Sequence, residues 1–375
     1  MKVQKITMAV AVLATALAFP AAAQASTGRG PVKVAAYDLG DGAFQDPAVP
    51  GPIELAAVVH YPARLGSTPR PLIVQLHGSW WTCADRRAEA DLRAAEQRHD
   101  ETAARQAREA LGGWPCRPGV PPLPSERGYD YLGDQLARAG FVVVSLRANG
   151  INAAGTGLDA YGARARLINK HLAMWRDLSA TGTGDLAGKL VDPATGRPDP
   201  IDFRGRVDMT DVGTMGHSRG GKAVMWQASD KHRAEWPAGV RIRAVFALAP
   251  VYFHYPEEDI GDDLVTTIPF TVLTGSCDGA VGTVGTGYVK DARGKNPGPL
   301  EAISLHGANH NFYNTQWSLG GGQVMAEDDA LREPGTPTGR CHGIGADKDT
   351  DRQLTEERQR RLASKYIIAF FGHRL

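Results

Sequence analysis

Residues 212–222, with the sequence VGTMGHSRGGK, contain the pattern Gly-x-Ser-x-Gly with Ser218 at its centre. A short apolar strand, 212–215, is predicted before the pattern, and a segment compatible with a helix, 221–229, follows it. A serine between a strand and a helix must lie on a sharp turn, and flanking glycines let the backbone approach closely there. The pattern therefore predicts a strained turn that presents the Ser218 hydroxyl above the edge of a sheet, as a candidate nucleophile.

The same stretch nearly matches a phosphate-binding loop, Gly-x-x-x-x-Gly-Lys, but Ala223 replaces the Ser or Thr that must come next. Without that hydroxyl a magnesium ligand is missing. We therefore expect neither a nucleotide nor any other cofactor at this turn.

A serine nucleophile needs a general base, and the base needs an orienting acid. Asp278 follows the predicted strand 270–274, and His310 follows the predicted last strand, 303–305. Parallel strands place such residues at one edge of a sheet, where this fold class builds its sites. Ser218, Asp278 and His310 are therefore the predicted catalytic residues.

Alternatives to two of these residues stay open. His306 is a rival base, although it lies nearer to the end of its strand and should reach the site less easily. Asp262 and Asp263 are weaker rivals for the acid because they precede their strand.

Two backbone N–H groups must stabilise the oxyanion of an acyl-transfer intermediate. Arg219, which follows the nucleophile, is expected to supply one. The other is expected from residues 77–81, HGSWW, with Ser79 as first choice and Trp80 as second. Aromatic residues at the same predicted edge are candidates for a substrate wall or for core packing: Trp80, Trp81, Tyr252, Phe253 and Tyr255.

Strand-like and helix-like segments alternate along the chain. The predicted strands are 32–39, 53–61, 72–76, 141–146, 212–215, 244–249, 270–274 and 303–305, and predicted helices include 125–139, 221–229 and 356–371. This alternation predicts an α/β fold, with a mostly parallel central sheet and helices on both faces.

Two segments depart from the alternation. Residues 84–111 are rich in Ala, Arg and Glu, which predicts an exposed helix or helical hairpin inserted into the domain. Residues 317–355 are rich in Gly, Pro and Asp and are expected to form a long surface excursion. Within it, 347–351 begins like a calcium loop, but the required Gly and Glu are replaced, so no metal site is expected.

The N-terminus has the pattern of a secretory signal peptide. Lys2 and Lys5 precede an apolar run, 6–19, and small residues follow up to Ala25, after which cleavage is predicted. The alternative is a membrane anchor, but the run is shorter than the roughly 20 apolar residues that a span needs. We expect a secreted or periplasmic protein whose residues 26–375 form one domain.

Four cysteines would then meet an oxidising compartment, where disulfides persist. Three pairings are possible, and pairing of neighbours gives Cys83–Cys116 and Cys277–Cys341. No C-x-x-C pair is present, so a zinc ribbon or a redox dithiol has no support.

Composition excludes other classes of protein. The chain has 375 residues, of which 42% are hydrophobic, which is enough to bury a sizeable core. Lys and Arg number 42 against 41 Asp and Glu, so no charge excess would attract nucleic acid or an anionic membrane.

These motifs together resemble the α/β-hydrolase superfamily. The resemblance rests on His-Gly after a strand at 77–78, GHSRGG at 216–221, Asp278 after a strand, and Gly-x-x-His-x-Phe at 307–312. The turn at 216–222 is similar to that of chlorophyllase-type and dienelactone-hydrolase-like esterases, and the whole arrangement is similar to secreted, cutinase-like polyester hydrolases and lipases.

The resemblance covers roughly residues 32–375, apart from 84–111, and implies hydrolysis of carboxylic esters without a metal or organic cofactor. His217 replaces the aromatic residue usual in the polyester hydrolases, which argues against polymer substrates. The expected substrate is a small-molecule, lipid or polymer ester, cleaved through an acyl-enzyme on Ser218. The alternatives are a peptidase or amidase on the same fold and a non-catalytic binding protein.

Overall fold

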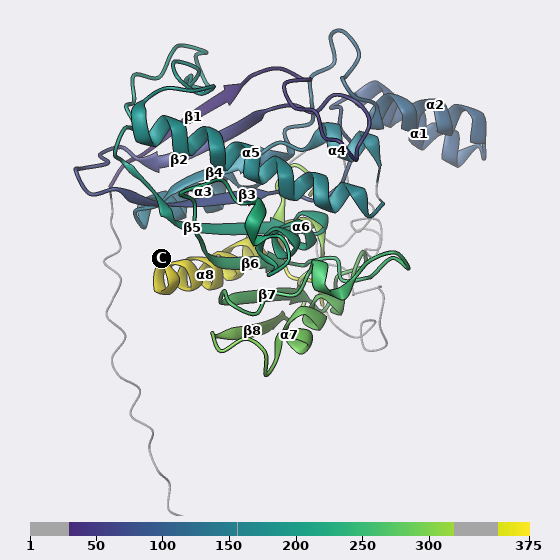
Figure 1. Cartoon of the computed structure of the whole chain (residues 1–375). Helices are drawn as coiled ribbons and strands as arrows, with labels where there is room; N and C mark the ends of the chain where they lie inside the picture. Colours follow the sequence, from purple (N-terminus) through teal and green to yellow (C-terminus); the bar gives the residue numbers. More distant parts are fainter. Residues whose placement is uncertain (1–29, 156, 319–351) are drawn as a thin grey trace, which may run out of the picture.

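One eight-stranded sheet organises the chain, with the strand order β1-β2-β4-β3-β5-β6-β7-β8 (Figure 1). The computed structural model describes residues 30–155, 157–318 and 352–375. The strands are β1 (Val32–Asp38), β2 (Ala56–Pro62), β3 (Arg70–Leu76), β4 (Val142–Leu146), β5 (Val207–His217), β6 (Ile242–Leu248), β7 (Phe270–Gly275) and β8 (Leu300–Leu305). The β1–β2 and β2–β4 pairs are antiparallel, and every other pair is parallel, which confirms the predicted mostly parallel sheet.

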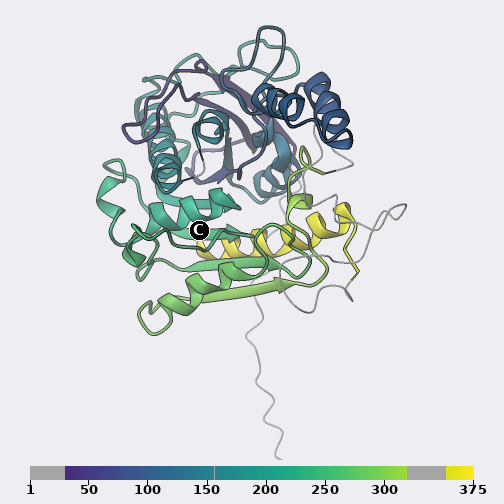
Figure 2. The same cartoon turned by 90° about the vertical axis from the view of Figure 1, so that its right-hand side faces the viewer.

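Helices cover both faces of this sheet, as predicted (Figures 1 and 2). The α-helices are α1 (Arg86–Gln97), α2 (Glu101–Gly112), α3 (Asp130–Arg138), α4 (Asn149–Ala154), α5 (Asp159–Thr181), α6 (Arg219–Ala228), α7 (Gly287–Ala292) and α8 (Glu356–Arg374). Successive strand residues point to opposite faces, so the sheet contributes to two separate cores. Leu72 and Val74 of β3 belong to the core that includes residues of α5, α6 and α7, whereas Ile73 belongs to the core that includes residues of α3 and α8.

Three strand bounds differ from those predicted by three residues or more. β2 begins at Ala56 rather than 53, because Ile53 forms an isolated bridge with Phe44 instead. β5 begins at Val207 and β8 at Leu300, both earlier than predicted. The extra residues mix apolar and polar side chains, with Val207 and Met209 buried and Thr210 and Glu301 exposed, so the continuous apolar runs used for prediction did not include them.

Residues 86–112 form the helical pair α1 and α2, which extends away from the sheet in Figure 1. Small side chains let the two helices pack closely, and their shared core is made of Ala88, Leu92, Ala95, Ala104, Ala107 and Leu111. Cys83 and Cys116 form the predicted disulfide at the base of this pair. Cys277 is also disulfide-bonded, and its predicted partner, Cys341, lies outside the described residues.

Other predicted features also fall outside the described residues, namely the signal peptide 1–25 and the calcium-like segment 347–351. Most of the predicted surface excursion, 317–355, also lies outside the described residues. Trp317 is buried, and its indole Nε1 donates a hydrogen bond to the Ser125 hydroxyl (3.0 Å). Within the part of the chain that the structure describes, no helix is long and apolar enough to cross a membrane.

Candidate active site

The turn between β5 and α6 holds Ser218 in a conformation that non-glycine residues rarely adopt. β5 ends at His217, α6 begins at Arg219, and Ser218 between them has φ 58° and ψ −120°. A positive φ of this kind costs about 1–3 kcal/mol and persists only where the surroundings enforce it. The sharp turn predicted from the sequence is therefore present, and its strain lies on the candidate nucleophile.

The flanking glycines make this turn possible because no side chain fits at either position. A Cβ on Gly216 would lie 1.9 Å from the carbonyl oxygen of Gly220, and one on Gly220 would lie 2.5 Å from that of Leu76. Both distances are far below van der Waals contact, so larger residues would force the helix away from the sheet. The Gly-x-Ser-x-Gly pattern is thus a packing requirement at the end of β3 and β5.

Asp278 and His310 form a buried pair at the same edge of the sheet, after β7 and β8. His310 Nδ1 lies 2.8 Å from Asp278 Oδ2, and both side chains are almost fully buried. Asp278 Oδ1 accepts hydrogen bonds from the backbone N–H groups of Ala280, Val281 and Gly282 (2.9, 2.7 and 3.2 Å). Because a carboxylate only accepts, it fixes the tautomer with hydrogen on Nδ1, leaving Nε2 able to take up a proton.

Close backbone contacts bring the loops after β7 and β8 together. A Cβ on Gly275 would lie 2.2 Å from the carbonyl oxygen of Ala308, and the Cys277 N–H donates to that same oxygen (2.9 Å). His306, the alternative base, is exposed, and it is His310 that contacts Asp278. The alternative acid Asp263 instead pairs with Lys222.

His217 lies directly under the ring of His310. The two ring centroids are 4.8 Å apart, and the Tyr129 hydroxyl lies 2.8 Å from His217 Nδ1. Burial, and then the neighbouring His310, hold the pKa of His217 well below its usual value, so this ring stays neutral. The neutral His217 ring therefore packs against His310 and adds no positive charge beside it.

The loop after β3 places Gly78 against the nucleophile. A Cβ on Gly78 would lie 2.6 Å from the Cβ and 3.1 Å from the Oγ of Ser218, so only glycine fits. The Gly78 carbonyl is held by His77 Nδ1 (2.7 Å) and by the Asn152 side-chain amide (3.3 Å). In a trans peptide the N–H points opposite to the carbonyl, so the Ser79 N–H points away from His77 and Asn152.

His77 is a structural part of this loop. The Ala148 N–H donates to His77 Nε2 (2.9 Å), so the ring proton lies on Nδ1 and is donated to the Gly78 carbonyl. Burial lowers the pKa of His77 to about 3, and the ring is therefore neutral at physiological pH. The backbone bend that orients the Ser79 N–H is therefore held by the His77 side chain, as well as by the close approach that Gly78 allows.

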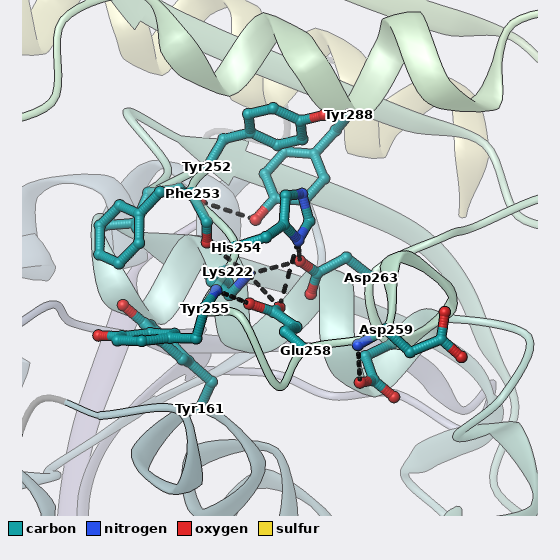
Figure 3. Close-up of polar contacts among 12 residues, drawn as sticks. Tyr161, Lys222, Tyr252, Phe253, His254, Tyr255, Glu258, Asp259, Asp263 and Tyr288 are labelled. Atoms are coloured by element: carbon teal, nitrogen blue, oxygen red, sulfur yellow. Dashed lines mark hydrogen bonds and ion pairs between the residues drawn. The ribbon is translucent and has the colours of Figure 1, made fainter.

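The loop after β6 begins beside the nucleophile and is anchored by a buried lysine (Figure 3). The Val251 N–H donates to the Ser218 carbonyl (3.2 Å). Lys222, one turn into α6, donates to the Phe253 carbonyl (3.2 Å), to Glu258 Oε1 (2.5 Å) and to Asp263 Oδ2 (2.6 Å). These contacts bind the loop to the helix that carries the nucleophile.

This lysine also explains why the neighbouring acids need no metal. His254, Glu258 and Asp263 are spaced such that they could hold a metal ion. The Lys222 ammonium already binds the carboxylates of Glu258 and Asp263, and the side chains of the lysine and of both acids are buried. Burial raises the pKa of Asp263 to about 7, against the opposing effect of Lys222. The cluster is therefore an internal ion triad that depends on the lysine.

Lys222→Met is expected to reduce the free energy of unfolding by about 3–5 kcal/mol, because it leaves two buried carboxylates without their cation. The defect should grow with pH. Loss of Lys222 raises the pKa of Asp263 further, so the folded state keeps a proton that the unfolded state releases above pH 4. Thermal or urea unfolding at pH 5 and pH 8 measures both effects.

Lys231→Met is the matched control, because Lys231 is half exposed and pairs with Asp262 at the surface. It should cost less than about 1 kcal/mol at either pH. Two results would contradict the ion triad. One is an equal loss of unfolding free energy in the two variants, and the other is a loss in Lys222→Met that is smaller at pH 8 than at pH 5.

The predicted aromatic wall is only partly assembled. Trp80 and Trp81 pack against each other (5.5 Å between ring centroids), and Trp81 also contacts Gly112 of α2. The Tyr252 hydroxyl donates to Asp291 (2.6 Å), which holds this ring inward against Tyr288. Phe253 is 44% exposed and is available to a ligand.

Sequence reasoning missed several polar residues around the turn: Tyr129, Asn152, Arg164 and Trp317 as neighbours of the site, and His77 and His217 as supports. His77 and His217 stand in the motifs at 77–81 and 216–222, but no sequence signal shows their supporting roles. No spacing rule links the other four residues to Ser218, so sequence alone could not have identified them.

The chain matches no family model and no curated protein sequence. Its fold is similar to 739 chains of solved structures. Among them is a ferulic acid esterase from Streptomyces cinnamoneus, with a TM-score of 0.50 and 15% sequence identity over 92% of this chain and 91% of that one. The strand order, the helices on both faces and this similarity together show that the chain has the α/β-hydrolase fold.

Proposed function

We propose that this protein is a serine hydrolase that cleaves carboxylic esters through an acyl-enzyme on Ser218. The observation that carries the proposal is the strained Ser218 turn (φ 58°, ψ −120°) at the edge where the Asp278–His310 pair also lies. Strain at a serine, a hydrogen-bonded base and a buried orienting acid are the parts that nucleophilic acyl transfer requires.

In the acylation step, Ser218 Oγ attacks the ester carbonyl while His310 Nε2 takes the hydroxyl proton. The carbonyl π electrons move onto oxygen, and backbone N–H groups of Ser79 and Arg219 stabilise the oxyanion. Arg219 is the first residue of α6, where the helix dipole also favours negative charge. Collapse breaks the ester C–O bond, and His310 returns the proton to the leaving alcohol.

In the second step, water replaces the alcohol. His310 removes a proton from water, the resulting hydroxide attacks the acyl carbonyl, and the same N–H groups hold the second oxyanion. Collapse releases the carboxylic acid and returns the proton to Ser218. Asp278 stays ionised throughout and stabilises the imidazolium that forms twice in each turnover.

Esters are the proposed substrates for two reasons. The motifs at 77–78, 216–222 and 307–312 resemble those of esterases, and a protein of similar fold is a ferulic acid esterase. The proposed substrate is a small-molecule ester, with the exposed ring of Phe253 as a candidate contact, and neither a metal nor an organic cofactor has a part in the proposed chemistry.

We further propose that residues 26–375 form one exported hydrolase domain, with 84–111 as an insert and 317–355 as an excursion from it. The signal-peptide pattern before Ala25 supports export. So does the Cys83–Cys116 disulfide, because such bonds persist in oxidising compartments.

The proposal predicts that the protein hydrolyses p-nitrophenyl esters faster than aminoacyl p-nitroanilides, and that a fluorophosphonate probe labels the peptide containing Ser218. Esters graded from acetate to octanoate then define the acyl length. Faster cleavage of the anilides would indicate a peptidase or amidase. No turnover together with no labelling would indicate a binding protein.

A further inference from the structure

Arg164 of α5 is a fully buried guanidinium beside the loop after β3. Its exposed fraction is 0%, and Nη2 donates to the Ser79 hydroxyl (2.9 Å) and to the Asn152 side-chain oxygen. Nη1 donates to the Ala160 carbonyl (3.0 Å), and Nε has no hydrogen-bond partner among the described residues. Every partner of this cation within the described chain is therefore neutral.

Two partly buried arginines of the protein, by contrast, have carboxylate partners. Arg147 pairs with Glu126 at 2.7 Å, and Arg166, two residues after Arg164 on the same helix, pairs with Asp46 at 2.7 Å. Within the described residues, no carboxylate lies within 4.0 Å of Arg164. Glu54, which acts on Arg164 from farther away, is held by the N–H groups of Asn149 and Gly150 (2.6 and 2.9 Å).

An unpaired buried charge is unfavourable for the folded state. Burial, and then the charge of Arg219, lower the pKa of Arg164 to about 9, but the group remains protonated at neutral pH. The guanidinium is thus a fixed positive charge that the resting protein does not neutralise.

We propose that Arg164 is a positioning residue for the oxyanion hole, whose counter-charge is the oxyanion formed during ester hydrolysis. It holds the Ser79 hydroxyl and Asn152, and Asn152 in turn holds the Gly78 carbonyl, so the Gly78–Ser79 peptide is fixed from the guanidinium side. Negative charge that develops at the Ser79 N–H then lies near an uncompensated cation in a site of low dielectric. The inference rests on the proposed function.

Arg164→Gln is expected to lower kcat for p-nitrophenyl acetate about 10-fold to 100-fold, less than the 10²–10³ that a direct oxyanion donor contributes. KM should change little, because the ground-state ester carries no charge there. The inhibition constant of phenylboronic acid, which forms a negatively charged tetrahedral adduct with serine, should rise by the same factor as kcat falls. Arg164→Lys should recover part of both losses.

Asn152→Asp is a second variant that does not depend on removing the arginine. It places a carboxylate at the position where Asn152 already accepts a hydrogen bond from Arg164, so the cation gains a partner. The melting temperature should rise while kcat and boronate affinity fall. Asp also lacks the amide that donates to the Gly78 carbonyl, so Asn152→Leu, which loses the same amide without adding a charge, is the control. Asn152→Asp should lose more kcat and more boronate affinity than Asn152→Leu, whereas a purely structural Arg164 predicts equal losses.

Arg166→Gln is the matched control, with the same substitution on the same helix at an arginine that pairs with Asp46. It should lower the melting temperature but leave kcat and the boronate inhibition constant within about twofold of the wild type, since it lies in another network. If Arg164→Gln does not fold, the comparison of Asn152→Asp with Asn152→Leu decides the question.

The inference is overturned if folded Arg164→Gln or Asn152→Asp keeps the wild-type kcat, or if Arg166→Gln loses as much as Arg164→Gln. This failure is distinct from failure of the proposed function. If only the inference about Arg164 fails, the wild type still hydrolyses esters and is labelled at Ser218. If the proposed function fails, the wild type does neither.

Discussion

Ser218→Ala is expected to lower kcat for p-nitrophenyl acetate by about 10⁴–10⁶-fold, the loss typical when a catalytic nucleophile is removed. The residual rate should reflect only binding and the oxyanion hole. Fold and KM should change little, because Ala has the same backbone restrictions as Ser and the substitution removes a single oxygen atom. Steady-state kinetics, circular dichroism and fluorophosphonate labelling together test this result.

Ser218→Gly is the control that separates the backbone from the hydroxyl. It should be as inactive as Ser218→Ala but melt at a higher temperature, because glycine adopts φ 58° and ψ −120° without strain. The strain relieved is about 1–3 kcal/mol, which exceeds the roughly 0.4–1 kcal/mol by which glycine's extra freedom stabilises the unfolded chain. Ordinary turnover by either folded variant would remove Ser218 from the mechanism.

The sheet and its helices could be predicted because their signals are local. Runs such as 141–146 are apolar apart from Ser145, as is typical of strands buried on both faces, and Gly and Pro mark where such runs end. Bounds were predicted less well at 207–211 and 300–302, where apolar and polar residues are mixed. There the hydrogen bonding of the neighbouring strand, rather than the residue's own hydrophobicity, decides the conformation.

The turn at Ser218 and the Asp278–His310 pair were predictable because their positions follow strands. The residues around them were not. Arg164 lies in the second turn of α5, and only the packing of that helix against the loop after β3 brings it to Ser79. His217 was recognised as a departure from related sequences, but its contact with His310 depends on β8 lying three strands away in the sheet.

His310→Ala is expected to be as damaging as Ser218→Ala, with kcat reduced about 10⁴–10⁶-fold, because the serine then has no group to take its proton. His306→Ala should have a mild effect, since His306 is exposed and Asp278 pairs with His310 at 2.8 Å. His310 is buried and His306 is exposed, so the melting temperature of each variant is measured to separate loss of packing from loss of the base. Steady-state kinetics of the two single variants test this ranking.

The double variant Ser218→Ala/His310→Ala provides the stricter test. Residues that act as one unit are strongly non-additive, because removing either one already abolishes the step that needs both. The double variant should therefore be no slower than either single variant. Losses that multiply would mean that His310 acts independently of Ser218. A severe effect of His306→Ala with a mild effect of His310→Ala would instead identify His306 as the base, and Asp278 would then orient a histidine that takes no part in the reaction.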